Sequence, residues 1–345
     1  MNFIKILQKD QEIWNLFTRK EEYNPSIRDK YDRFPYYASL NRHIFEPTAS
    51  RYLIQQGLHV EYPEGKPFAV CLTHDIDAIY QKKVVKVVAA LRHLYESRFS
   101  MCMQSLLMMR SKKLPAWNFS DIMTLEERYG AKSSFYFMVQ ERDDPEYNYD
   151  IEDCKTIIRE ISDNGWEVGL HGGHTSYNNL VEIKEKKLRL EKVVNKKVVG
   201  YRNHYLRFRV PDTWEHLSNA GFQYDTTLGY QNCIGFRNGM CHPFKPYNLN
   251  TQREIDVLEI PLMVMDRSIE NDMNLDSRNA WEMIRRLIDT VAECHGVVTL
   301  LWHNTWLIGE KWELYERILR YCAEKDAWMT SGEQISKFWN DYAKN

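Results

Sequence analysis

The sequence lacks any long apolar run, and this is one of several absences that narrow the class of protein. No stretch approaches the roughly 20 apolar residues that a membrane-spanning helix needs. The net charge is only −2, which gives no electrostatic reason to expect binding to nucleic acid or to an anionic membrane surface. No internal repeat or low-complexity tract is present. These absences argue against membrane-spanning, repeat and nucleic-acid-binding proteins.

The cysteines are informative through the patterns that they do not form. All seven are scattered, their number is odd, and no Cys-x-x-Cys pair of the zinc-ribbon type occurs. We therefore expect reduced thiols buried as small apolar side chains. The first ten residues are also too polar for a secretory signal. Together these features predict a cytoplasmic protein, and they leave its oligomeric state open.

The composition that is present is that of a globular α/β protein. The 345 residues are 43% hydrophobic and 27% charged, and they would accommodate an α/β barrel of about 250 residues with an extension. Residues 1–66 are predicted to form a mostly helical N-terminal extension that ends in a turn-rich segment at 62–67. Residues 67–345 are predicted to form an α/β domain with a helical insertion at about 78–120.

Short apolar runs alternate with helical patterns from residue 67 onward. Strands are predicted at 68–73, 133–139, 166–170, 197–201, 255–262, 297–302 and 327–330. Amphipathic helices are predicted at 151–164, 178–195, 211–220, 276–294 and 311–325. This alternation predicts a mainly parallel sheet, either open or closed into a (β/α) barrel of seven or eight strands. In both architectures functional residues gather at the carboxyl ends of the strands.

The first strand ends in two carboxylates, Asp75 and Asp77, one residue apart. Because side chains alternate between the two faces of a strand, both carboxylates are expected to point the same way. Two close carboxylates repel each other unless a cation lies nearby. The pair therefore predicts a catalytic site that holds a metal ion or an arginine.

Three later strands also end in polar residues. The third strand is followed by His171 and His174, separated by two glycines. Two imidazoles and one carboxylate with an open position suit a catalytic divalent metal, most simply zinc, with cobalt, manganese or nickel as alternatives. The remaining two ends carry Arg202 with Tyr205, and His303.

Taken in order, these segments resemble the motifs of the polysaccharide deacetylase family (NodB homology, carbohydrate esterase 4-like). Residues 73–77 resemble its Thr-Phe-Asp-Asp strand end, and 202–205 its Arg-x-Pro-Tyr segment. Residues 300–303 are similar to its final Leu-x-x-His strand end, and 130–137 to its second strand. The resemblance covers roughly residues 67–340 and implies a distorted NodB-type (β/α) barrel.

The resemblance also implies a role for each matching residue. Asp77, His171 and His174 would hold the metal, and Asp75 would act as the general base, oriented by Arg202. The backbone N–H near Tyr205 would stabilise the oxyanion. A protonated His303 would donate its proton to the leaving amine.

Some positions depart from the family pattern. The family spaces its two histidines four residues apart, which places Thr175 rather than His174 at the third ligand position, so either residue could complete the site. The fourth motif is not evident, and Asp225 is the first candidate for a carboxylate near His303, with Asp266 as the second.

Three further residues are assigned to substrate binding. His204 stands where the family has proline, Arg237 lies in a predicted pocket-wall loop, and Trp306 flanks the last motif. For Arg237 a structural role is equally open, and for Trp306 the alternatives are stacking on a sugar ring and packing in the core.

The sequence thus predicts a metal-dependent enzyme that removes an N-acetyl group from a sugar of a surface-glycan or capsule precursor. Its partner would be a carbohydrate, and peripheral contact with a lipid-linked substrate stays open. Two alternatives remain: hydrolysis of a non-sugar C–N bond, such as a cyclic imide or ureide, and a non-catalytic protein that binds a glycan or a partner. The altered histidine spacing is the main argument for the non-catalytic alternative.

Overall fold

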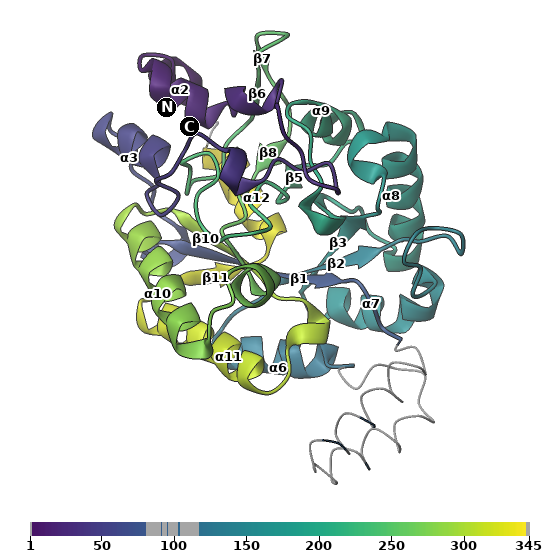
Figure 1. The fold of residues 1–345 in the computed structure, drawn as a ribbon. Coiled ribbons are helices and arrows are strands. Elements are labelled where there is room, and N and C mark those ends of the chain that lie inside the picture. Colours follow the sequence, from purple (N-terminus) through teal and green to yellow (C-terminus); the bar gives the residue numbers. More distant parts are fainter. Residues whose placement is uncertain (1, 81–90, 92–94, 96–102, 104–116, 343–345) are drawn as a thin grey trace.

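The computed structural model describes residues 2–80, 91, 95, 103 and 117–342 (Figure 1). Most of the helical insertion predicted at about 78–120 lies outside the described residues. After this segment, helix α6 (Phe119–Arg128) leads into the second strand of the sheet. No helix in the described part of the chain is long and apolar enough to cross a membrane.

A curled parallel sheet forms the centre of the molecule (Figure 1). In the described residues it has nine strands: β1 (Ala69–Ile76), β2 (Ser134–Met138), β3 (Glu167–Gly172), β4 (Gly200–Asn203), β5 (Tyr224–Asp225), β8 (Leu258–Glu259), β9 (Val264–Met265), β10 (Val297–Leu301) and β11 (Trp328–Thr330). Eight of them follow the order β8-β5-β4-β3-β2-β1-β10-β9, and β11 pairs with the first half of β1. The predicted distorted (β/α) barrel is therefore confirmed, with more strands than the predicted seven or eight.

Helices cover the outside of this sheet (Figure 1). After α6 come α7 (Lys155–Asp163), α8 (Leu180–Val194), α9 (Asp212–Asn219), α10 (Ser277–Glu293), α11 (Glu310–Glu324) and α12 (Gly332–Tyr342). In α10 the buried residues Trp281, Ile284, Leu287, Ile288 and Val291 recur at helical spacing, so one face packs on the sheet. The sequence pattern located α7 to α11, whereas α6 and α12 were not predicted.

The N-terminal segment consists of short helices joined by irregular chain. The helices are α1 (Phe3–Leu7), α2 (Gln11–Phe17) and α3 (Thr48–Gln55), with 3-10 turns at Lys20–Glu22, Tyr36–Ala38 and Pro63–Gly65. Helix α1 lies beside α12, where the rings of Phe3 and Trp339 meet edge to face at 6.4 Å. In a hairpin of later residues, β6 (Tyr247–Asn248) pairs with β7 (Arg253–Glu254), and the ring of Tyr247 packs on Trp14 at 5.0 Å. The boundary at residue 66 stays a prediction.

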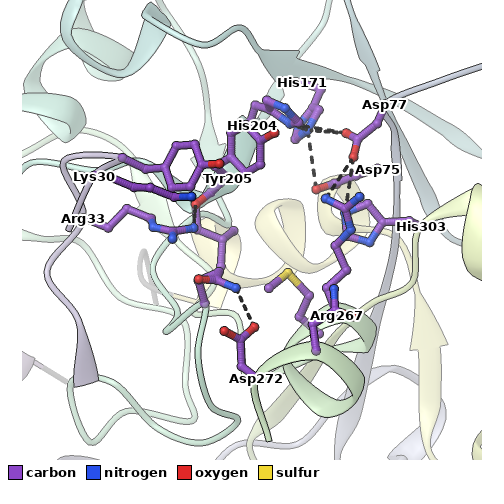
Figure 2. Close-up of a pocket in the computed structure, with 15 residues that line it drawn as sticks. Lys30, Arg33, Asp75, Asp77, His171, His204, Tyr205, Arg267, Asp272 and His303 are labelled. Carbon is purple, nitrogen blue, oxygen red and sulfur yellow. Dashed lines mark hydrogen bonds and ion pairs between the residues drawn. The ribbon is translucent and has the colours of Figure 1, made fainter. Parts of the chain in front are cut away.

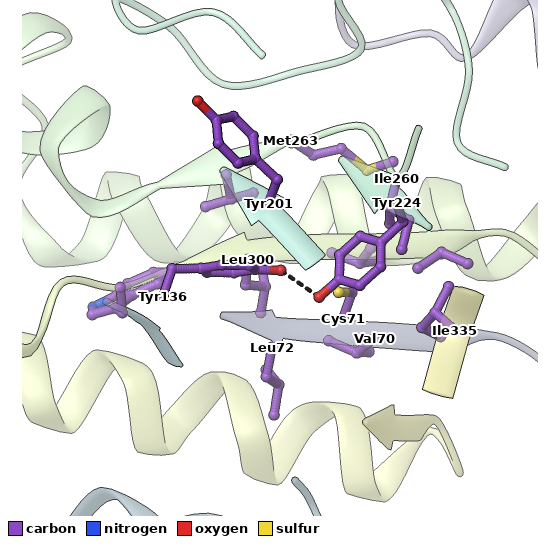
Figure 3. Packing of buried hydrophobic residues seen from close by; sticks show 14 of the residues in the cluster. Val70, Cys71, Leu72, Tyr136, Tyr201, Tyr224, Ile260, Met263, Leu300 and Ile335 are labelled. Carbon is purple, nitrogen blue, oxygen red and sulfur yellow. Dashed lines mark hydrogen bonds between the residues drawn. The ribbon is translucent and has the colours of Figure 1, made fainter. Parts of the chain in front are cut away.

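Buried tyrosines pack among apolar side chains in the core around the sheet (Figure 3). The hydroxyls of Tyr136 and Tyr224 hydrogen-bond at 2.7 Å, and Tyr224 donates to Glu167 at 2.7 Å. The two tyrosine rings occupy the space that a Cβ atom would need at Gly169 and Gly200. Glycine at these strand positions therefore lets the aromatic rings fill the barrel.

Candidate metal centre and active site

The two aspartates of the first strand lie at the opening of a cavity of about 490 Å³ (Figure 2). Every residue of β1 is buried, and Asp77 follows its last residue. Asp75 and Asp77 both line the cavity, as their alternation predicts. Ile76, which lies between them in sequence, is buried. His74, on the other face of the strand, hydrogen-bonds to Glu126 at 2.8 Å. The predicted shared orientation of the two carboxylates is therefore confirmed.

His171 lies at the end of β3 with its ring fixed by the neighbouring strand. Its Nδ1 donates a hydrogen bond to the backbone carbonyl of Arg202, its register partner on β4, at 3.0 Å. The proton on Nδ1 leaves a lone pair on Nε2 in the neutral ring. This Nε2 lies 3.1 Å from Oδ1 of Asp77. The strand register thus directs a ligand-type nitrogen of His171 at Asp77.

His204 follows β4 and joins the same cluster. Its Nδ1 lies 3.4 Å from Oδ1 of Asp77 and 3.3 Å from Nε2 of His171. Its Nε2 lies 3.1 Å from the Glu146 carboxylate, to which it donates. Burial lowers the pKa of His204, but the carboxylates of Asp77 and Glu146 outweigh this and raise the pKa to about 9. Without a metal, His204 is therefore an imidazolium at neutral pH, and its positive charge lies between the carboxylates of Asp77 and Glu146.

These three side chains fit a divalent metal ion. The ligand atoms of Asp77, His171 and His204 all lie within 4.8 Å of one another. Oδ1 of Asp77 is buried and has no hydrogen-bond partner among the described residues. Burial raises the pKa of Asp77, yet the positive charge of His204 and the close imidazoles of His171 and His303 bring it well below its usual value. Two neutral imidazoles and one ionised carboxylate, open to a cavity, form a donor set typical of catalytic zinc.

Asp75 lies beside this cluster and next to a buried guanidinium. Its Oδ1 is 3.6 Å from Nη1 of Arg202, and its Oδ2 is 3.7 Å from Nε2 of His171. Arg202 is fixed by two hydrogen bonds to Thr226, at 3.1 Å to the carbonyl and 2.9 Å to the hydroxyl. Because Arg202 is fully buried, it places a fixed positive charge beside the Asp75 carboxylate.

His303 follows β10, the strand next to β1, and is held in one orientation by Asp266. The imidazole Nδ1 donates to Oδ1 of Asp266 at 2.7 Å, and the backbone N–H of His303 donates to Oδ2 at 2.7 Å. The free Nε2 of the ring lies 3.7 Å from Oδ2 of Asp77. Burial lowers the pKa of His303, but the carboxylate of Asp266 outweighs it, so the net pKa is raised. This favours a protonated imidazole at the cavity.

The structure corrects the predicted third metal residue. Strand β3 ends at Gly172, and His174 follows it. The ring centroids of His174 and Tyr205 lie 6.1 Å apart. The hydroxyl of Thr175 donates to Glu182 at 2.8 Å. Neither residue belongs to the group of side chains that could hold a metal ion. The third member of that group is His204, which the sequence had assigned to substrate binding.

Asp225 and Arg237 also lie elsewhere than predicted. Asp225 is buried on β5, where it accepts from Thr227 at 2.6 Å, and burial raises its pKa to about 6. Asp266, the second candidate, is the carboxylate at His303. Arg237 is buried and donates to Glu22 at 3.0 Å and to the carbonyl of Gly229 at 2.7 Å, which is a structural role. Through Glu22, its guanidinium connects the N-terminal segment to the barrel.

Trp306 is half-buried at the end of the last strand motif. Its ring packs under two cations: the guanidinium carbon of Arg267 is 5.7 Å from the ring centroid, and Nζ of Lys311 is 3.8 Å from it. Trp306 is not among the residues that line the cavity, whereas Arg267 is. The predicted contact of Trp306 with substrate is therefore indirect in this geometry.

The N-terminal segment supplies a wall of the cavity that the sequence did not predict. Lys30, Tyr31 and Arg33 line it together with Tyr205 (Figure 2). The rings of Tyr31 and Tyr205 stack at 4.5 Å, and Arg33 donates to the carbonyl of Tyr205 at 2.9 Å. Tyr205 also donates to Glu146 at 2.7 Å and has a left-handed backbone, with φ of 58°. No local pattern in residues 30–33 signals this contact across more than 170 residues of sequence.

Comparison with known proteins identifies the fold. No family model and no curated protein matches the sequence. A candidate polysaccharide deacetylase from Mycobacterium smegmatis is 18% identical, covers 82% of this chain and 94% of its own, and has a TM-score of 0.55. The chain has the polysaccharide deacetylase fold.

Two further solved structures with this fold are more distant. A CE4 family pseudoenzyme from Bacillus anthracis is 11% identical over 80% of this chain and 66% of its own, with a TM-score of 0.44. A candidate polysaccharide deacetylase involved in O-antigen biosynthesis, from Bordetella bronchiseptica, is 15% identical over 78% of this chain and 85% of its own, with a TM-score of 0.38. The fold shared with the Mycobacterium smegmatis structure agrees with the resemblance in the motifs, while function depends on the site itself.

Proposed function

We propose that the protein is a metal-dependent hydrolase that removes an N-acetyl group from a sugar of a surface-glycan or capsule precursor. The observation that carries this proposal is the cluster of Asp77, His171 and His204, whose ligand atoms lie within 4.8 Å of one another. Beside it lie a carboxylate next to a buried arginine, Asp75, and an imidazole held by a carboxylate, His303. A base that takes a proton from water and an acid that protonates the departing amine both accelerate amide hydrolysis.

The three clustered side chains would hold the metal, and a divalent ion bound there polarises a carbonyl and makes water more acidic. Asp75 takes a proton from the attacking water, and Arg202 orients its carboxylate. His303 then delivers the proton on its Nε2 to the departing amine nitrogen. The backbone N–H near Tyr205 is the proposed donor to the oxyanion.

The size and lining of the cavity support a sugar substrate. A volume of about 490 Å³ falls in the range of small-molecule sites, and polar side chains dominate the lining. The non-catalytic alternative loses its main support, because the altered histidine spacing no longer leaves the cluster short of a third ligand-type side chain. No feature of the cavity specifically favours a cyclic imide over an acetamido sugar.

The proposal is tested with purified, zinc-loaded protein. Acetate release from a panel of N-acetylated sugars is measured before and after removal of the metal with a chelator. We expect release that stops with the chelator and returns with added zinc. Asp75→Asn should abolish release while the bound metal stays near one per chain. Absence of bound metal together with chelator-insensitive release would overturn the proposal.

A further inference from the structure

Arg267 is the one arginine of the cavity whose guanidinium makes no hydrogen bond to any residue that the structure describes. Its only ion-pair partner in that part of the chain is Asp77, with Nη1 3.8 Å from Oδ2, beyond hydrogen-bonding distance. Its Nε is buried and unpartnered. In contrast, Arg33 in the same cavity bonds to Asp29 at 2.7 Å and to the Tyr205 carbonyl at 2.9 Å.

Unused donors on a partly buried arginine are costly unless a ligand takes them. An arginine presents five N–H groups in a planar fork that matches the oxygens of a phosphate or carboxylate. The side chain of Arg267 is 34% exposed, and its guanidinium reaches the cavity beside His303 (Figure 2). The ring of Trp306 lies 5.7 Å from the guanidinium carbon and fixes it by a cation–π contact. A rigid, unsatisfied fork therefore faces the space next to the cluster.

The charges around the cavity also favour an anion. Its lining holds three cations, Lys30, Arg33 and Arg267, and three carboxylates, Asp75, Asp77 and Asp272. Arg33 is paired with Asp29, and Asp75 lies against Arg202.

A divalent ion at Asp77 would more than neutralise that carboxylate. Its negative charge would then no longer balance the positive charge of Arg267. Lys30 has no ion-pair partner in the described part of the chain and lies with its ammonium 5.0 Å from the Tyr31 ring. Positive charge is then in excess, although Asp272, bonded by Gln231 at 2.6 Å, offsets part of it.

We propose that the substrate sugar carries an anionic group, a phosphate ester or a carboxylate, that Arg267 binds next to the N-acetyl group, with Lys30 adding positive charge. This inference rests on the proposed function and specifies its substrate class. Because Arg267 is 3.8 Å from Asp77, an anion on Arg267 lies close to the reacting amide, as a substituent on the same sugar ring would. Arg267 therefore acts as a specificity-determining residue.

The test compares three probes on the zinc-loaded protein: N-acetylglucosamine, N-acetylglucosamine 1-phosphate and an N-acetylhexosaminuronic acid. We expect kcat/KM to be about 10- to 100-fold higher for one charged probe than for the neutral sugar, as charge-assisted hydrogen bonds to an arginine provide. Whichever charged probe is preferred identifies the anion as phosphate or carboxylate. Arg267→Gln should remove most of this preference, and Arg267→Lys should keep part of it, because the charge stays but the fork is lost.

Arg285→Gln is the matched control, since Arg285 lies on the exposed side of α10 and pairs with Glu282 at 2.9 Å. It should leave the preference unchanged. Binding of inorganic phosphate by calorimetry provides a readout independent of turnover, and Arg267→Gln should weaken it about tenfold or more.

The outcomes separate the two proposals. Turnover of all three probes at similar rates, with phosphate binding unaffected by Arg267→Gln, would overturn the anion site and leave deacetylation standing. Phosphate binding that depends on Arg267, without acetate release from any probe, would support the anion site and count against the proposed reaction. If no probe releases acetate and phosphate binding does not depend on Arg267, both proposals are overturned.

Discussion

His204 donates its Nε2–H to the carboxylate of Glu146 over 3.1 Å, and this bond orients the ring so that its Nδ1 faces Asp77 at 3.4 Å. A carboxylate behind a ligating histidine fixes the tautomer and the orientation of the ring. The hydrogen bond from His204 is the largest of the influences that lower the pKa of Glu146, to about 2, so it stays ionised. Glu146 also has a left-handed backbone with φ of 61°, which costs a non-glycine residue about 1 kcal/mol. The chain thus holds Glu146 in an unfavourable conformation behind His204.

Glu146→Ala is predicted to weaken zinc binding by about 10- to 100-fold, the usual effect of losing such a partner. The His204 ring would be free to rotate, and its other tautomer would place a proton on Nδ1. Glu146→Gln should retain much of the affinity, because its amide oxygen can still accept from Nε2. The dissociation constant is measured by competition with a chromogenic chelator.

Asp143→Ala serves as the control for Glu146, since Asp143 is an exposed carboxylate on the same loop. It should leave zinc affinity unchanged. An equal loss in both variants would mean that the loop as a whole, rather than the bond to His204, determines the affinity.

The identity of the third ligand is tested by a matched pair of histidine variants. His204→Ala removes a nitrogen that lies 3.4 Å from Asp77 and should reduce bound zinc far below one per chain. His174→Ala removes a ring that lies edge-on to Tyr205 and Tyr31 and outside the cluster of ligand-type atoms, so bound zinc should stay near one per chain. Zinc is measured by elemental analysis after gel filtration. The reverse pattern would restore His174, the residue that the sequence spacing favoured.

The Asp266–His303 pair predicts a shift in pH dependence. Burial lowers the pKa of His303, and the charge and hydrogen bond of Asp266 raise it to a net value above its ordinary one. Asp266→Asn removes the charge, so the pKa of His303 should fall by about 1 to 3 pH units. A general acid is active only below its pKa, and the alkaline limb of kcat/KM should therefore move to lower pH.

The control for this charge change is Asp256→Asn, which alters an exposed carboxylate that pairs with Lys245 at the surface. Its pH profile should match that of the unaltered protein. If the alkaline limb stays in place in Asp266→Asn, another group donates the proton and His303 has a different role.

The strand-end part of the site could be predicted from the sequence for a physical reason. Side-chain alternation gives Asp75 and Asp77 one orientation, and parallel strands bring their carboxyl ends to one edge, which places His171, Arg202 and His303 nearby. These relationships depend on periods and order, which a single sequence contains.

The remaining part depends on register and long-range packing, which a single sequence does not contain. His171 pairs with Arg202, and this register carries His204 to Asp77, whereas spacing along the chain suggested His174. Asp266 was only the second candidate because β9 has just two residues and gives almost no periodic signal. Tyr31 reaches the cavity only through the packing of the N-terminal segment.

Glu167 provides a prediction about stability within the barrel. Burial raises the pKa of this carboxyl from its ordinary 4.5 to about 7, although hydrogen bonds from Ser134 and Tyr224 oppose the rise. Between these two values the folded state binds more protons than the unfolded state, so the free energy of unfolding should fall as the pH rises from about 4.5 to 7. At about 1.4 kcal/mol for each pH unit of pKa difference, the loss amounts to roughly 3 kcal/mol.

Glu167→Gln has no proton to lose at this position, so its stability should fall less between pH 5 and pH 8 than that of the unaltered protein. The free energy of unfolding is measured by urea titration at both pH values, and the two differences are compared. Glu127→Gln is the control, because it makes the same change at a side chain that is 71% exposed at the surface. A pH-dependent loss in Glu167→Gln as large as in the unaltered protein would show that other groups produce it, and that Glu167 is already ionised within the folded barrel.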